Sequence, residues 1–379
     1  MKIGIDIRLI GKNQTGSEAV FFNLVRNLAM IDERNEYFLF TDIIDEQKIQ
    51  KIKNNLDLSG KNNFKIISLK NKNKFSWNFW TLPKYLRKNP ADIYLTQYIT
   101  PFFVPRKIKI LTIIHDVSFR VFPKLIKLSD LFFLRALIPI SLRRADKIIA
   151  VSNFTRDEII KYYKIKPEKV VCAYNAIADH FLMQSFSRDE LEEIRRKYNL
   201  PQKFILYVGT LQPRKNIPIL VEAYAKIKKQ LPDVRLVLFE GNKYNYDIKI
   251  DQAIEKNLLN KEEIMHSGFI AEEDKKAVIQ LADCFCYPSL YEGFGIPILE
   301  AFSCNVPCIV SKIPPHLEVA GNATLFFTPE NSSELAEKIS RILTNEHLRK
   351  KLIAKEHDQL ALFSWKETAK KMMEIFEEM

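Results

Sequence analysis

The sequence has few of the features that mark secreted, membrane-spanning or metal-binding chains. Its five cysteines form no Cys-x-x-Cys pair and stand mostly inside apolar runs, so we expect small buried side chains rather than disulfides or metal ligands. No run of about eighteen uncharged apolar residues occurs, and the N-terminus, MKIGIDIRLI, reads as a strand rather than as a signal peptide. An Asp-x-Asp pair, a spacing that often holds Mg²⁺, is also missing. We therefore expect a cytoplasmic chain with no resident metal and no cofactor.

Glycine is scarce as well, with ten in 379 residues, and two of them, Gly293 and Gly295, stand within three positions of each other. They lie in the stretch 287–304, YPSLYEGFGIPILEAFSC, where an apolar run passes through a loop into an apolar helix that begins near Pro297. Glycines at such a point let a backbone approach a ligand closely. The N–H groups of a first helical turn favour an anion, and a phosphate is the natural occupant.

Two acids flank this helix start, Glu292 in the loop and Glu300 in the first turn. The helix dipole by itself favours a carboxylate at Glu300, so a structural role is one interpretation. The other is that Glu300 accepts hydrogen bonds from sugar hydroxyls beside the phosphate, while Glu292 reaches another part of the same ligand. We favour the second interpretation and expect a nucleotide-sugar site that also includes Gly293, Phe294, Gly295 and Ile296.

Short apolar runs alternate with segments of helical period along the whole chain. This alternation is typical of parallel sheets covered by helices. We therefore predict an α/β fold with two doubly wound domains, 1–184 and 204–363, a polar linker at 185–203, and a last helix in 364–379. Ligands bind at the carboxyl ends of such strands, so we expect the site in a cleft between two facing sheets. The expected strands are 3–7, 37–40, 64–69, 93–95, 108–114, 148–151 and 170–173 in the first domain, and 204–208, 234–239, 263–266, 283–287, 306–310 and 325–327 in the second.

The net charge of +12 is concentrated in the first half of the chain. Residues 1–180 hold 31 Lys and Arg against 17 Asp and Glu, a balance of +14, whereas the remainder has a balance of −2. A positive field suits nucleic acid, an anionic membrane or a phosphorylated partner. Because no nucleic-acid module is recognisable, we expect no nucleic acid and favour a membrane or lipid phosphate. The basic, apolar segment 120–147 fits either a membrane surface or, as we favour, the core, since Pro139 interrupts it.

Further candidates follow predicted strands. Arg214 and Lys215 stand in YVGTLQPRKN, between a predicted strand and a predicted helix. Two adjacent cations are ordinarily a solvated surface feature. At the end of a strand, however, they would neutralise the charge of a diphosphate leaving group. His115 follows the strand 108–114, where the alternative is a neutral histidine that satisfies backbone groups. Gly16, in the loop between the first strand and the first helix, lets N–H groups approach an anion.

Several of these strings together resemble the retaining glycosyltransferases of family four (group 1), whose fold is called GT-B. The resemblance rests on EGFGIPILEA, on YVGTLQPRKN and on the pair His115 and Asp116, and it extends from GIDIR through AVSNFT to PPHLEVAGNATLFF. It covers nearly the whole chain. It implies two Rossmann-like domains facing a cleft, with the acceptor bound mainly by the first, the nucleotide sugar mainly by the second, and the last helix crossing back onto the first.

The resemblance also implies roles for single residues. Arg214 and Lys215 would hold the departing diphosphate, Glu292 the hexose and Glu300 the ribose, while His115 would contact the donor sugar.

The resemblance places the nucleobase at Gly268, Phe269 and Ile270, where an ordinary turn with a buried phenylalanine is the alternative. Members of the family usually carry two glycines in the first loop, whereas this chain has Gly16 followed by Ser17. That departure leaves a phosphate contact at Gly16 plausible and puts the fit of the acceptor side in question.

We therefore predict a metal-independent, retaining glycosyltransferase that moves mannose from GDP-mannose to a glycan or lipid-linked acceptor in surface polysaccharide synthesis. The run HDVSFRVFP and the RKN loop look most like bacterial mannosyltransferases. UDP-glucose or UDP-N-acetylglucosamine as donor, or a non-catalytic nucleotide-sugar-binding protein of the same fold, are the alternatives. The leaving phosphate would take the acceptor proton on one face of the sugar, and a double displacement with Glu292 as nucleophile is less favoured. We expect a peripheral position on the inner face of the cell membrane.

Overall fold

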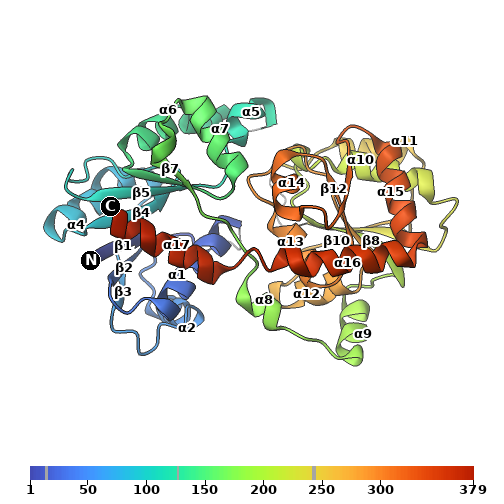
Figure 1. Cartoon of the computed structure of the whole chain (residues 1–379), viewed down its shortest axis with the longest axis horizontal. Helices are drawn as coiled ribbons and strands as arrows, with labels where there is room; N and C mark the ends of the chain where they lie inside the picture. The colour runs from blue at the N-terminus through green and yellow to red at the C-terminus, as the bar shows by residue number, and fades with distance from the viewer. Residues whose placement is uncertain (13–15, 126–127, 241–244) are drawn as a thin grey trace. The chain divides into compact units, whose positions relative to one another are not determined.

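The computed structural model describes residues 1–12, 16–125, 128–240 and 245–379, which form two compact units (Figure 1). Unit 1 consists of Met1–Ala178 with Ser364–Met379, and unit 2 of Asp179–Phe363. The stretch 185–203, predicted as a linker, is part of unit 2. It contains α9 (Arg188–Lys197), which packs on α12 (Glu272–Gln280).

Unit 1 is built on a seven-stranded parallel sheet in the order β3-β2-β1-β4-β5-β6-β7. The chain first builds outward from β1 to β2 and β3 and then returns to the other side of β1 with β4, as in doubly wound nucleotide-binding folds. The strands are β1 (Lys2–Asp6), β2 (Glu36–Thr41), β3 (Phe64–Ser68), β4 (Ile93–Gln97), β5 (Lys109–Ile114), β6 (Lys147–Ala150) and β7 (Val170–Cys172). The helical segments are α1 (Gly16–Ile31), α2 (Glu46–Asn55), α3 (Lys74–Ser76), the π-helix η1 (Trp77–Thr81), α4 (Leu82–Lys88), α5 (Ser118–Val121), η2 (Pro123–Leu125), α6 (Leu128–Arg144), α7 (Asn153–Tyr163) and η3 (Pro167–Lys169).

Unit 2 repeats the plan with a six-stranded parallel sheet in the order β10-β9-β8-β11-β12-β13. Two doubly wound sheets of seven and six strands confirm the predicted α/β fold. The strands are β8 (Lys203–Gly209), β9 (Val234–Glu240), β10 (Ile264–Gly268), β11 (Cys284–Tyr287), β12 (Cys308–Ser311) and β13 (Leu325–Phe327). The remaining helical segments are α8 (Asp179–Met183), η4 (Pro213–Lys215), α10 (Ile217–Ile227), α11 (Lys249–Lys256), α13 (Ile296–Ser303), α14 (Pro314–Ala320), α15 (Ser332–Thr344) and α16 (Glu346–Leu360).

The strands are continuous apolar runs because each is buried on both faces of its sheet. Ile3, Ile5 and Leu95 in unit 1 are fully buried, as are Leu206 and Phe285 in unit 2. Side chains that alternate across a strand are all apolar only where helices cover both faces. No helix in the described part of the chain is long and apolar enough to cross a bilayer.

The last helix, α17 (Trp365–Glu378), belongs to unit 1 and packs along α1 (Figure 1). Its buried positions Trp365, Ala369, Met372 and Phe376 follow one face of the helix. The hydroxyl of Thr368 also donates to the carbonyl oxygen of Tyr174 at 2.6 Å. This arrangement confirms that the last helix returns to the first domain.

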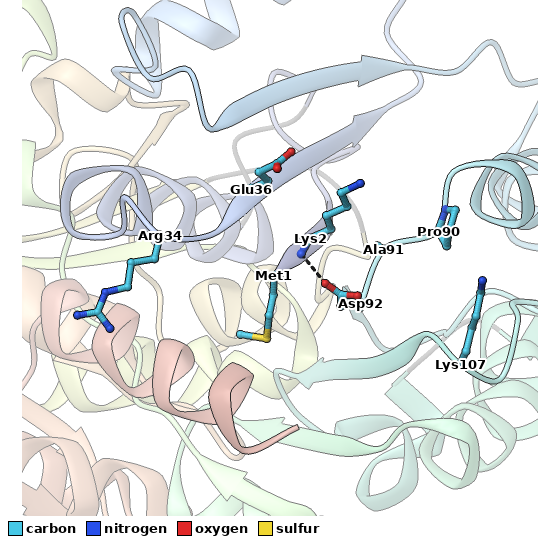
Figure 2. Close-up of a pocket in the computed structure, with 8 residues that line it drawn as sticks. All are labelled: Met1, Lys2, Arg34, Glu36, Pro90, Ala91, Asp92 and Lys107. Carbon is cyan, nitrogen blue, oxygen red and sulfur yellow. Dashed lines mark hydrogen bonds between the residues drawn. The ribbon is translucent and has the colours of Figure 1, made fainter.

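A hollow in unit 1 opens at the amino ends of its central strands (Figure 2). The backbone N–H of Lys2 donates to Asp92 Oδ2 at 2.7 Å on its wall. Parallel sheets bind ligands at the carboxyl ends of their strands, so this hollow lies at the wrong edge for a Rossmann-type site. Its lining residues are Met1, Lys2, Arg34, Glu36, Pro90, Ala91, Asp92 and Lys107.

The docking of α17 can be tested with Phe376→Ala. Truncating this buried ring should destabilise unit 1 by about 3–5 kcal/mol, because a cavity remains on the α1 side. All three tryptophans, Trp77, Trp80 and Trp365, belong to unit 1, so urea unfolding followed by tryptophan fluorescence reports on this unit. Glu377→Ala, an exposed neighbour, is the control. Equal midpoints for the two variants would contradict the docking.

Candidate functional site

Two loops at the carboxyl edge of the unit 2 sheet hold the predicted site residues. β8 and β11 are adjacent in the sheet, so the loops that follow them leave at the same edge. The loops are tied together, since the backbone N–H of Leu290 donates to the carbonyl oxygen of Arg214 at 2.8 Å. Asn216, in a left-handed conformation with φ 58°, donates its side-chain amide to the carbonyl oxygens of Pro288 and Pro329 at 3.2 and 2.9 Å.

The structure brings three of the four predicted catalytic side chains into one ion cluster. Lys215 Nζ lies 2.5 Å from Glu292 Oε1, and Arg214 NH1 lies 3.0 Å from Glu292 Oε2. The hydroxyl of Tyr287 accepts from Lys215 Nζ at 2.8 Å and donates to Glu292 Oε1 at 3.1 Å. Arg214 also donates to the carbonyl oxygen of Tyr291 at 3.1 Å. Two cations therefore share one carboxylate, and the cluster keeps one net positive charge.

The cluster fixes the charge states of its members. Burial by itself would raise the pKa of Glu292, but the charges of Arg214 and Lys215 hold that pKa well below its usual range. Burial and the charge of Glu292 both raise the pKa of the Tyr287 hydroxyl, which stays a neutral donor. Glu292 is therefore ionised throughout the physiological range and acts as an acceptor, not as a proton donor.

The helix after this loop begins within one residue of the predicted start, but Glu300 lies beyond its first turn, whereas the sequence indicates a place within it. Gly295 has φ 125°, and a Cβ there would lie 3.1 Å from Ile298 Cδ1, so a side chain at this position would be strained and crowded. Pro297 stands in the first turn of α13, and among the described residues no side chain caps its N-terminus. The start of α13 is thus suited to an anion.

Glu300 is held by a residue that sequence reasoning missed. Lys275, on α12, lies with its Nζ 2.5 Å from Glu300 Oε1. The other oxygen, Glu300 Oε2, is buried and has no hydrogen-bond partner among the described residues. Burial raises the pKa of Glu300, although the charge of Lys275 opposes this shift. Burial alone would lower the pKa of Lys275, but the charges of Glu300 and Glu272 outweigh it and raise that pKa. The contact with Lys275 uses one carboxylate oxygen and leaves Glu300 Oε2 for a ligand.

His316 is the second residue that sequence reasoning missed. Its Nδ1 lies 3.0 Å from the carbonyl oxygen of Ser311, which only accepts, so Nδ1 carries the proton. Burial lowers the pKa of His316 to about 4 and keeps the ring neutral. Its Nε2 is then an acceptor, buried and without a partner among the described residues, on a ring 5.3 Å from that of Tyr287.

The predicted nucleobase residues follow β10 at the same edge of the sheet. Gly268 has φ 68°, which suits a tight turn, and Ile270 is buried. Phe269, in contrast, is 59% exposed. The alternative of an ordinary turn with a buried phenylalanine therefore does not describe this loop.

His115 and Gly16 belong to unit 1 and not to the cluster of unit 2. His115 follows β5, and its Nε2 lies 2.8 Å from Oε1 of Gln97 at the end of β4. Burial lowers its pKa to about 4, so the ring is neutral. Asp116 Oδ1 accepts from the backbone N–H of Ser118 at 2.8 Å and serves the turn before α5. Gly16 is exposed at the first position of α1.

Replacing Lys275 with Met should destabilise the α12 and α13 region by about 3 kcal/mol near neutral pH, because Glu300 would be buried without its cation. Burial then raises the Glu300 pKa unopposed, and a raised carboxyl pKa stabilises the folded state only at low pH. The loss should therefore grow as the pH rises above the ordinary pKa range of a glutamate. Hydrogen exchange of the α13 amides in the full chain measures it.

Lys350→Met is the matched control, since Lys350 forms an exposed ion pair with Glu346 at 2.8 Å. It should leave exchange in α13 unchanged at every pH. A pH-independent loss in the Lys275 variant would mean that the pair contributes packing rather than charge.

Two family models match the chain, one in each unit. Residues 15–181 match the model described as Glycosyltransferase Family 4, and residues 190–359 match the model described as Glycosyl transferases group 1.

Individual proteins support the same assignment. The serotype-specific mannosyltransferase WbdA of Escherichia coli is 31% identical over 237 residues, 62% of this chain, and the match spans only 29% of WbdA. The O-antigen chain mannosyltransferase B of Escherichia coli is 28% identical over 356 residues, 93% of either chain. The structure of Anabaena Alr3699/HepE in complex with UDP and glucose superposes with a TM-score of 0.71 at 17% identity, over 100% of both chains, which shows the shared fold. The two family models together span most of the chain, which therefore belongs to the group 1, family 4 glycosyltransferases and has the GT-B fold.

Proposed function

We propose that this glycosyltransferase is a retaining enzyme that transfers mannose from GDP-mannose to a glycan or lipid-linked acceptor in surface polysaccharide synthesis. The observation that carries the proposal is the ion cluster of Arg214, Lys215 and Glu292 beside the start of α13. Mannose is favoured because the two Escherichia coli relatives are named as mannosyltransferases, one of them of the O-antigen chain. The enzyme would work in the cytoplasm, at the inner face of the membrane.

The donor would bind unit 2 through groups of opposite charge. Its diphosphate would lie at the start of α13 and against Arg214 and Lys215, whose charges Glu292 balances only in part. Glu300 Oε2, buried and so far without a partner among the described residues, would accept from a ribose hydroxyl. Glu292 would accept from hexose hydroxyls. The contact of His115 with the donor sugar stays a prediction.

The anomeric configuration would be retained because the acceptor attacks the sugar on the same face from which the diphosphate departs. The bond between the anomeric carbon and the phosphate oxygen breaks, the acceptor hydroxyl forms the new bond, and the departing phosphate takes its proton. Arg214 and Lys215 would stabilise the charge that develops on the leaving group. Glu292 is a poor nucleophile, because Lys215, Arg214 and Tyr287 all donate to its carboxylate. This bonding argues against a double displacement.

UDP-glucose is the second candidate donor. It is favoured by the fold shared with Alr3699/HepE, which was solved with UDP and glucose. The backbone of Gly268 to Ile270 and the exposed ring of Phe269 would meet the base in either case.

Transfer should proceed without an added metal ion, because two protein cations are available for the diphosphate. We expect radiolabelled mannose to pass from GDP-mannose to a membrane lipid extract at the same rate with and without EDTA. A rate that EDTA abolishes and Mn²⁺ restores would contradict metal independence. Transfer from UDP-glucose but not GDP-mannose would replace the donor, and no transfer from either would overturn the proposed function.

Glu300 and Glu292 should affect ligand binding differently when calorimetry measures the affinities of their variants for GDP and GDP-mannose. Glu300→Gln should weaken GDP at least about tenfold, since its partner is the ribose and Lys275 would lose its counter-charge. Glu292→Gln should not weaken GDP, because the amide oxygen can still accept from Lys215 and the bound diphosphate itself then balances the two cations, but it should weaken the hexose contribution of GDP-mannose. Equal losses of GDP affinity would show that Glu292 does not bind the hexose.

A further inference from the structure

His316 is a polar side chain beside the start of α13 that the proposed mechanism does not use. The side chain is fully buried, and a Cβ on Gly295, the residue before α13, would lie 3.6 Å from Cδ2 of its ring. Because Cδ2 is bonded to Nε2, the edge of the imidazole that carries Nε2 faces this glycine. The histidine therefore lies against the helix start to which we assign the diphosphate.

The imidazole also lies close to the ion cluster. Its centroid is 5.3 Å from that of the Tyr287 ring, whose hydroxyl donates to Glu292 Oε1 at 3.1 Å. Burial is the main cause of the lowered pKa of His316, but the charges of Glu292 and Lys215 also act on that pKa, in opposite directions. His316 is therefore near both parts of the proposed donor site, the helix start and the carboxylate that we assign to the hexose.

Ser311 determines which ring nitrogen carries the proton. Its carbonyl oxygen and its Oγ lie 3.0 and 3.1 Å from His316 Nδ1. The Ser311 hydroxyl donates its own proton to the carbonyl oxygen of Ser289, so both Ser311 oxygens accept from Nδ1. Nε2 is left as a buried acceptor, and no group among the described residues donates to it. Such an atom calls for an explanation, because a buried acceptor without a donor is costly.

Only a group that donates a hydrogen bond can satisfy Nε2. The phosphate oxygens of a diphosphate are acceptors, so they would repel the lone pair of this nitrogen. Protonation would turn Nε2 into a donor, but burial disfavours the charged ring. In a nucleotide sugar bound at the start of α13, the hexose is attached directly to the diphosphate, and its hydroxyls are donors. A hexose hydroxyl is therefore the partner that fits.

We propose that His316 Nε2 accepts a hydrogen bond from a hydroxyl of the donor hexose and thereby helps to select the sugar. The hexose would then meet two acceptors of different charge, the carboxylate of Glu292 and the neutral imidazole of His316. A sugar that lacks this hydroxyl would leave Nε2 unpaired in the complex and would be rejected. The inference rests on the proposed function for a nucleotide sugar at the start of α13, but not for the identity of its base.

Two substitutions separate the roles of the two ring nitrogens. The side-chain amide of asparagine reaches the position of Nδ1 and can keep the bond to Ser311, whereas that of glutamine reaches the position of Nε2. His316→Asn should lower the ratio of GDP-mannose affinity to GDP affinity by about fivefold to tenfold, and His316→Gln should keep most of that ratio. Calorimetry with the full chain measures both affinities. His347→Asn, on the exposed side of α16, is the matched control and should change neither.

Three outcomes of this experiment would overturn the inference. If His316→Asn lost GDP and GDP-mannose affinity equally, the histidine would support the helix start and not the hexose. An unchanged ratio would show that Nε2 meets no part of the sugar. A ratio that glutamine lowers as far as asparagine does would show that the acceptor at Nε2 is not what the hexose requires.

Nitrogen NMR of the native chain tests the contact without any substitution. With nitrogen-15 in the six histidines, His316 is recognised as a neutral ring protonated on Nδ1. His115 differs, because its Nε2 faces Oε1 of Gln97, which only accepts, and therefore carries the proton. GDP-mannose should move the His316 Nε2 resonance upfield, as accepting a hydrogen bond does, and GDP should not. Equal positions in the two complexes would overturn the inference.

The same measurements with UDP-glucose and UDP distinguish this inference from the proposed function. If mannose transfer proceeds but His316→Asn leaves the hexose contribution intact, the inference fails and the proposed function stands. If the chain instead uses UDP-glucose, and His316→Asn lowers the ratio of UDP-glucose affinity to UDP affinity, the proposed donor fails and the inference stands.

Discussion

The site of unit 2 depends on the pairing of two cations with one buried carboxylate. Lys215 and Glu292 are each almost fully buried, and neither would tolerate that position alone, since an unpaired buried charge costs several kcal/mol. Their pairing joins the loop after β8 to the loop after β11. Each loop then presents its helix start at the same edge of the sheet. The residual positive charge of the cluster attracts a diphosphate to this edge of the sheet. The ion pairs that hold the two loops together therefore also form part of the binding site.

Much of the fold follows from local patterns. Doubly buried strands need continuous apolar runs, and those runs predicted the seven and six strands that the structure contains. α16 escaped prediction because its pattern is weak, with only Leu352 and Glu356 buried. The membership of 185–203 in unit 2 was also hidden, because α9 has no buried residue and its polar sequence resembles a linker.

The site was less predictable than the fold, because its residues meet across long sequence separations. The motifs identified Arg214, Lys215 and Glu292 as separate ligand contacts, but only the structure shows that they bind one another. Lys275 stands in the run EEDKK, which by itself indicates a solvated helix face, and its pairing with Glu300 depends on how α12 packs on α13. His316 stands in the string PPHLEVAGNATLFF, but that string assigned it no role, and its place beside the ring of Tyr287 is visible only in the fold.

The first loop of unit 1 differs from the family in a way that has an electrostatic consequence. Where a second glycine is usual, the chain continues with Ser17 and Glu18, and Glu18 accepts from the backbone N–H of Gly11 at 2.7 Å. The carboxylate of Glu18, in the first turn of α1, already interacts favourably with the positive end of that helix dipole. A phosphate bound at Gly16 would lie beside this negative charge, whereas one at the start of α13 would lie beside Arg214 and Lys215. We therefore expect the diphosphate to draw its affinity from unit 2, and the first loop to act on the acceptor side.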